Sequence, residues 1–142
     1  DTIPEAYDHE FTFGLGTAAE DTPVSRLEES VRFCRTPIFV AAGSHEGTLP
    51  LQGRFLTLLQ GDAQVSAVKT AEDGTGDILV RLAELKGEAG NTVLQLSGTP
   101  AAACYVDAHE TPLAGEQPAL SGDQVTVALR PYGVTALRIS MK

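Results

Sequence analysis

Three carboxylates, Glu72, Asp73 and Asp77, lie close together in the stretch EDGTGD. Such a cluster could hold a divalent cation or supply an acid–base pair. A calcium loop, however, needs a longer series of oxygen ligands that ends in a bidentate glutamate, and a glycosidase acid needs a cleft that raises its pKa. The two intervening glycines instead favour a hairpin turn between apolar runs. We therefore predict a turn here rather than a metal loop or a reaction centre.

The histidines and cysteines are the other candidates for chemistry. His9, His45 and His109 are each followed by glutamate, but no two have a spacing that brings two imidazoles to one metal. Cys104 and His109 could be paired as nucleophile and base, yet no orienting group or oxyanion loop accompanies them. Both Cys34 and Cys104 have apolar neighbours, which favours two buried free thiols over a disulfide. We predict no catalytic residue, cofactor-binding residue or metal ligand in this chain.

The aromatic residues bear on sugar binding, because carbohydrate-binding modules often stack sugars on exposed rings. The chain has no tryptophan, and its phenylalanines occur in apolar patterns that predict core positions. These phenylalanines are Phe11, Phe13, Phe33, Phe39 and Phe55. Only Tyr7, Tyr105 and Tyr132 remain as a stacking surface. An independent carbohydrate-binding or adhesion β-sandwich module stays open as an alternative.

The charge balance narrows the classes of partner. The net charge is −9, from 19 acidic and 10 basic residues, and the basic residues are scattered. This balance repels nucleic acid and anionic membrane surfaces, so we expect neither as a partner. Hydrophobic residues make up 42% of the 142 residues, enough for a buried core. The sequence shows neither an apolar run long enough to span a membrane nor a signal peptide.

The first residue is Asp1 and the sole methionine is Met141, so we expect a processed product or a piece of a longer polypeptide. The sole asparagine, Asn91, is followed by Thr-Val and makes no glycosylation sequon. The absence of sequons and of a signal predicts a bacterial, cytoplasmic protein.

One helix is expected near residues 23–35. Thr22 suits the N-cap, Pro23 suits the first helical position, and Pro37 ends the helix. A single apolar stripe follows the helical period and consists of Val24, Leu27, Val31 and Cys34.

The rest of the chain predicts short strands separated by turn residues, the pattern of a sandwich or barrel. Strands are expected at residues 9–15, 37–42, 54–59, 65–71, 77–85, 92–97, 102–107, 124–130 and 134–140. The predicted fold class is all-β, an antiparallel β-sandwich of immunoglobulin-like or supersandwich type that carries one short helix.

Several sequence segments occur in an order and at a spacing that resemble those of a known family. They are HEFTFGL at 9–15, KTAEDG at 69–74, RL at 81–82, DAHETPL at 107–113 and PYGVTALR at 131–138. Their order and spacing resemble the carboxy-terminal β-sandwich region of glycoside hydrolase family 38 α-mannosidases, and the resemblance covers essentially the whole chain.

The resemblance implies an enzyme of mannose metabolism that hydrolyses terminal α-mannosides with retention, using zinc and an aspartate nucleophile. It places both in an amino-terminal catalytic domain that matches no residue here, so no cofactor is expected in this chain. Residues 1–142 would be the carboxy-terminal region, with 61–142 as the terminal sandwich proper.

The partners implied by the resemblance are the catalytic and other domains of the same polypeptide, and a mannose-containing glycan through the parent enzyme. The expected role is structural, and the chain alone would be inert as a hydrolase. We expect an exposed apolar patch that packs against the neighbouring domains. Within the chain, Asp73 and Asp77 are the candidates for a loop that reaches the rim of the substrate site.

Overall fold

The computed structural model describes residues 8–18 and 20–142, which belong to two compact units, Asp1–Ala41 and Ala42–Lys142. The first unit contains helix α1, Pro23–Cys34, and the predicted N-cap is confirmed. Thr22 Oγ1 accepts a hydrogen bond from the Ser25 amide at 3.1 Å, and Ser25 Oγ accepts one from the Thr22 amide at 3.2 Å. This reciprocal capping satisfies amides that the first helical turn leaves unpaired.

The predicted strands at 9–15 and 37–42 are wrong, because the structure has no strand in either segment. Alternation in a sequence shows that a strand could present one apolar face, but a strand forms only where another pairs with its backbone. No strand of the described residues pairs with these two segments.

The predicted burial of the phenylalanines is wrong for the same reason, since most of them lie in or beside these unpaired segments. All five are exposed: Phe11, Phe13, Phe33, Phe39 and Phe55. Both cysteines are free, as predicted, but Cys34 is exposed and Cys104 only half-buried. Cys34 closes a helix that buries none of its residues.

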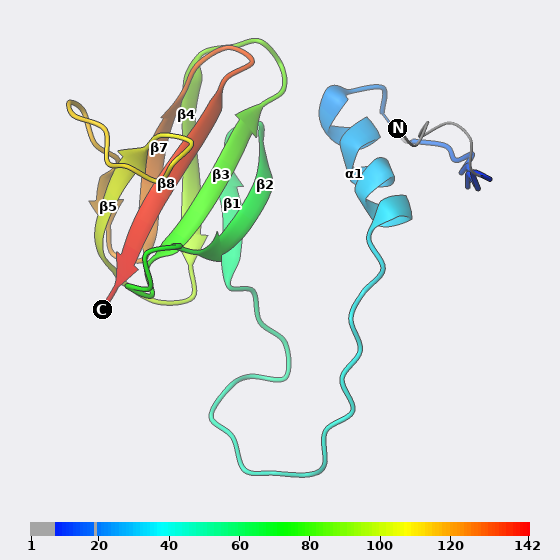
Figure 1. Ribbon diagram of the computed structural model, residues 1–142, viewed down its shortest axis with the longest axis horizontal. Coiled ribbons are helices and arrows are strands. Elements are labelled where there is room, and N and C mark those ends of the chain that lie inside the picture. Colours follow the sequence, from blue (N-terminus) through cyan, green and yellow to red (C-terminus); the bar gives the residue numbers. More distant parts are fainter. Residues whose placement is uncertain (1–7, 19) are drawn as a thin grey trace, which may run out of the picture. The chain divides into compact units, whose positions relative to one another are not determined.

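The second unit is a sandwich of two four-stranded antiparallel sheets (Figure 1), which confirms the predicted fold class. Sheet A has the order β1-β4-β7-β6 and contains Leu56–Gln60, Gly90–Leu96, Gln124–Leu129 and Ala119–Ser121. Sheet B has the order β2-β3-β8-β5 and contains Ala63–Thr70, Ile78–Glu84, Val134–Met141 and Pro100–Val106.

The predicted strands from residue 54 onward are all present, with ends shifted by a few residues. Strand β6, Ala119–Ser121, was not expected. It is only three residues long, and a three-residue run is too short to show an alternation that would distinguish it from a loop.

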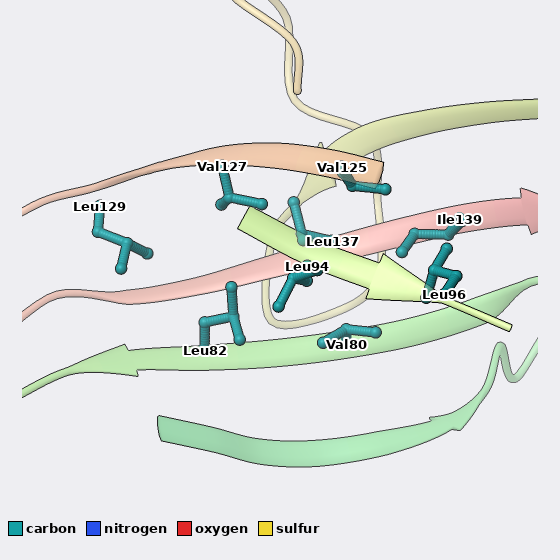
Figure 2. Close-up of a cluster of buried hydrophobic side chains, with 9 residues drawn as sticks. All are labelled: Val80, Leu82, Leu94, Leu96, Val125, Val127, Leu129, Leu137 and Ile139. Atoms are coloured by element: carbon teal, nitrogen blue, oxygen red, sulfur yellow. The ribbon is translucent and has the colours of Figure 1, made fainter. Parts of the chain in front are cut away.

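The core lies between the sheets and comes from the two central strands of each. Figure 2 shows the side chains from β3, β8, β4 and β7 pointing toward one another. They are Val80, Leu82, Leu94, Leu96, Val125, Val127, Leu129, Leu137 and Ile139. Because successive side chains alternate between faces, the residues between these ones form the outer faces of the sandwich.

No helix of the described residues is both long enough and apolar enough to cross a membrane.

Candidate functional site

The acidic stretch forms a turn between β2 and β3. Gly74 and Gly76 have φ of 76° and 82°, a conformation that favours glycine. Asp73 Oδ1 accepts hydrogen bonds from the Thr75 amide at 3.1 Å and the Thr75 hydroxyl at 2.7 Å. The turn therefore has the glycine conformations that the sequence predicts, and the structure adds an aspartate that accepts from the backbone two residues ahead of it.

Arg138 of β8 binds both candidate carboxylates of this turn. Its Nη2 lies 2.6 Å from Asp73 Oδ2 and its Nε lies 2.7 Å from Asp77 Oδ2. The same Nη2 donates to Thr75 Oγ1 at 2.8 Å. The side chain of Arg138 is only 16% exposed. The arginine therefore fixes the turn to a central strand of sheet B.

The pKa of each of these carboxyls is lowered. For Asp73 the main cause is the hydrogen bonds donated by Thr75, with a further contribution from Arg138. For Asp77 the hydroxyl of Ser140 contributes most, followed by Arg138. Both groups are thus stabilised as anions.

A second ion pair joins β2 to the loop after β5. Lys69 Nζ lies 2.5 Å from Glu110 Oε1 and 2.6 Å from Glu72 Oε1. The Glu72 amide also donates to Glu110 Oε2 at 2.9 Å. Glu110 holds the pKa of Lys69 above its usual value, and Lys69 lowers the pKa of Glu110.

The loop at 107–111 is folded so that it brings Glu110 to this position. Asp107 Oδ1 accepts from the amides of His109 and Thr111, each at 2.9 Å. Glu110 has a φ of 66°, a left-handed conformation that a glutamate rarely adopts. Its side chain is 10% exposed. This conformation places the Glu110 carboxylate against Lys69.

An apolar side chain lies beneath these charges. Leu79 of β3 is 1% exposed, although it is not part of the core between the sheets. In register it is flanked by Lys69 on β2 and Arg138 on β8, on the outer face of sheet B. We call the six charged residues around it the ionic cluster: Lys69, Glu72, Asp73, Asp77, Glu110 and Arg138.

Glu84, at the end of β3, is a further buried carboxylate of the sandwich. Its oxygens accept from the amides of Lys86 at 2.6 Å, Gly87 at 2.7 Å and Tyr132 at 2.8 Å. Burial opposes ionisation, but these backbone hydrogen bonds together outweigh it and lower the pKa of Glu84. Glu84 thus joins two loops as a structural anion.

The described residues do not assemble a metal site. In residues 8–18 and 20–142, no three side chains of His, Cys, Asp or Glu are grouped so that they could hold a metal ion. The chemistry of a zinc site therefore does not fit the described residues.

Of the three tyrosines, the two in the described residues, Tyr105 and Tyr132, do not form a common stacking surface. The Tyr105 ring packs against the core, and its hydroxyl accepts from the Ala128 amide at 2.9 Å. Tyr132 is 75% exposed. Tyr7 lies outside the described residues. A cavity of about 420 Å³ adjoins Tyr105 at one end of the sandwich, but the Tyr132 side chain is not among its lining residues.

The sequence pattern singled out the acidic residues of the turn but not the basic residues that bind them. Lys69 and Arg138 are each the only charged residue of their strand, and Arg138 alternates with the core residues Leu137 and Ile139. A single charge within an otherwise uncharged strand is the signal that could have identified them, since such a charge needs a partner when the face is covered.

Residues 62–136 match the family described as glycosyl hydrolases family 38 C-terminal beta sandwich domain. No curated protein matches the chain. The family match spans more than half of the 142 residues, and the chain belongs to this family.

Proposed function

We propose that this chain is a non-catalytic, C-terminal domain of an α-mannosidase that supports the catalytic domain and is inert alone. The observation that carries this proposal is the ionic cluster. Its four carboxylates all pair with Lys69 or Arg138, and so hold one loop and one turn against sheet B. These ion pairs stabilise the sandwich.

The electrostatics of these carboxylates is the opposite of what glycoside hydrolysis needs. A general acid must remain protonated near neutral pH, which requires a raised pKa. The pKa is lowered for Asp73, Asp77, Glu84, Asp107 and Glu110. None of these five groups is suited to donate a proton to a leaving group.

The exposed apolar residues support a role in contacts between domains. In the second unit Leu49 and Leu51 are almost fully exposed, and Phe55 and Leu59 are about half exposed. In the first unit Leu15, Ile38 and Phe39 are also almost fully exposed. Apolar side chains exposed in such number favour burial against other protein surfaces.

Under this proposal the zinc ion and the nucleophile belong to the catalytic domain of the same polypeptide. Mannose-containing glycans are substrates of that domain, and this chain contributes to their hydrolysis through stability. The lowered pKa values of Asp73, Asp77 and Glu110, which form ion pairs within the sandwich, support that division of roles.

The proposal is tested by assaying the purified chain on an aryl α-mannoside with added zinc, after circular dichroism has shown that it is folded. We expect no hydrolysis above buffer. A titration with α-mannosides, followed by NMR, should give no saturable shift. Hydrolysis would overturn the non-catalytic assignment, and a saturable shift would favour the independent carbohydrate-binding module.

A further inference from the structure

Sheet A contains no charged residue in any of its strands. The strand sequences are LTLLQ, GNTVLQL, ALS and QVTVAL. Sheet B, in contrast, has Lys69, Arg81, Glu84 and Arg138 within its strands. In a protein with 20% charged residues and a net charge of −9, a whole sheet without charge departs from the mixed, charged surface that keeps domains soluble.

The outer face of sheet A can be derived from the strand register. Val93 lies opposite Thr126, and Thr126 lies opposite Ala119. A neighbouring row joins Thr57 to Gln95, Gln95 to Gln124, and Gln124 to Ser121. Ala128 and Asn91 form a third pair. These residues alternate with the core residues of the same strands, so they share the outer face.

Charges begin immediately outside this face. Asp62 follows the end of β1, Asp123 precedes β7, and Arg130 follows β7. Asp123 Oδ2 accepts from Gln95 Nε2 at 2.9 Å, at the edge of the face. An uncharged centre within a charged rim is the composition of a protein–protein interface, in which charged residues are depleted at the centre.

The same composition argues against other partners. No aromatic residue occurs in the four strands, so a sugar ring has nothing to stack on. No basic residue is present to bind phosphate. A second copy of the chain would bring a further net charge of −9, which opposes association.

From these observations we infer that the outer face of sheet A docks against another domain of the same polypeptide, through an equally uncharged surface of small apolar and amide side chains. This inference rests on the proposed function and specifies the surface that performs it. The family to which the chain belongs is defined as a C-terminal domain, so its partner is covalently attached and present at high effective concentration. Weak, uncharged contacts are then sufficient to hold the face closed.

The test is the reactivity of cysteines introduced one at a time into the full-length polypeptide, in which the native Cys34 and Cys104 are replaced by alanine. Ala119→Cys and Ala128→Cys place a thiol on the outer face of sheet A, at positions exposed in the structure described here. Ala102→Cys is the matched control, since Ala102 is also an exposed alanine but lies on the outer face of sheet B. Each substitution adds one sulfur atom to a side chain without hydrogen bonds, so folding should be preserved.

Labelling with a bulky maleimide is followed by mass spectrometry of the peptide that carries each new cysteine. We expect the two sheet A positions to react at least about tenfold more slowly than Ala102→Cys, because labelling must wait for the domains to separate. In denaturant all three should react at the same rate. Equal rates in the native protein would overturn the inference.

Two further outcomes identify a different occupant and would also overturn it. Protection that is lost on dilution indicates a second copy of the polypeptide, and protection that appears only with added α-mannan indicates a glycan. The proposed function is judged separately. If deleting the domain weakens the enzyme while both cysteines react freely, the supporting role stands and only this docking surface is rejected.

Discussion

The two outer faces of the sandwich differ in how their side chains are satisfied. On sheet B the part of the face around Leu79 is covered by the chain itself, since the ionic cluster binds the turn at 72–77 and the loop at 107–111 over Leu79. On sheet A the face has no charges and no loop bonded across it by ion pairs of the described residues. The centre of the sheet B face is therefore buried within the domain, whereas the sheet A face becomes buried only when another domain docks on it.

This difference shows how a small domain can stabilise its own fold with one face and bind another domain with the other. Charged side chains that pair with one another stabilise a face and at the same time prevent other proteins from binding to it. A face without charges has neither property. The segments at 69–74, 107–113 and 131–138, on which the resemblance to the family was based, supply every member of the ionic cluster except Asp77. These segments therefore identify the outer face of sheet B, which the ionic cluster stabilises.

The largest difference between the faces should appear when matched apolar residues are shortened. Leu79→Ala removes a buried side chain beneath the ionic cluster and should lower the free energy of unfolding by about 2–5 kcal/mol. Val93→Ala, on the outer face of sheet A, should cost about 1 kcal/mol or less, because Val93 is half-buried. Urea denaturation measures both. Equal costs would mean that the two faces are equally covered.

Substitution of Arg138 should have the next largest effect. Arg138→Gln leaves Asp73 and Asp77 without their cationic partner, so the melting temperature should fall. Arg138→Lys should lie between wild type and Arg138→Gln, because lysine keeps the charge but loses the planar fork.

The control for this substitution is Arg130→Gln. Arg130 is exposed and makes no ion pair among the described residues, so its replacement should change the melting temperature little. If Arg130→Gln and Arg138→Gln have the same effect, the ionic cluster does not stabilise sheet B.

Acid should destabilise the sheet B face selectively. The pKa values of Asp73, Asp77 and Glu110 are lowered in the folded state below those of the free side chains. The folded state therefore binds fewer protons than the unfolded state at acid pH, and the stability that is present above the unfolded pKa values is lost as the pH falls through the folded pKa values.

Unfolding experiments at a series of pH values below about 5 measure this loss. Arg138→Gln should flatten the dependence, because without the arginine the two aspartates titrate closer to their unfolded values. Val93→Ala should retain the wild-type slope. If the unfolding free energy of Arg138→Gln depends on pH as steeply as that of the wild type, the ionic cluster is not the cause of the acid sensitivity.

The smallest effect is expected on catalysis. In the full-length enzyme, Asp73→Asn combined with Asp77→Asn should leave kcat and KM on an aryl α-mannoside within about twofold of wild type, while thermal stability falls. Such a result would remove the idea that this turn forms the rim of the substrate site. A raised KM with unchanged stability would support it.

The sandwich was predictable from the sequence because its strands alternate over five to eight residues with turn chemistry between them, as in ILVRLAE and VTALRISM. The segments at 9–15 and 37–42 carry similar patterns and form no strand. A pattern specifies which face a strand would present, but the partner that makes it a strand is not encoded locally.

The site was predictable only in part. The turn chemistry of Asp73 with its glycines is local and could be inferred. The contacts of Arg138 with Asp77 and of Lys69 with Glu110 join residues that are far apart in the sequence, so they depend on the strand order. The absence of charge from each of the strands of sheet A was visible in the sequence. That the four strands form one sheet, and so one uncharged face, is shown only by the strand pairing.

The central claim is that this domain supports an α-mannosidase, and deletion tests it most directly. The full-length polypeptide and a form without residues 1–142 are compared for hydrolysis of an aryl α-mannoside with zinc, before and after heating. The account predicts activity in the long form that is lost, or inactivated at lower temperature, in the deleted form. An inactive long form, or a deleted form with unchanged activity and heat resistance, would contradict it.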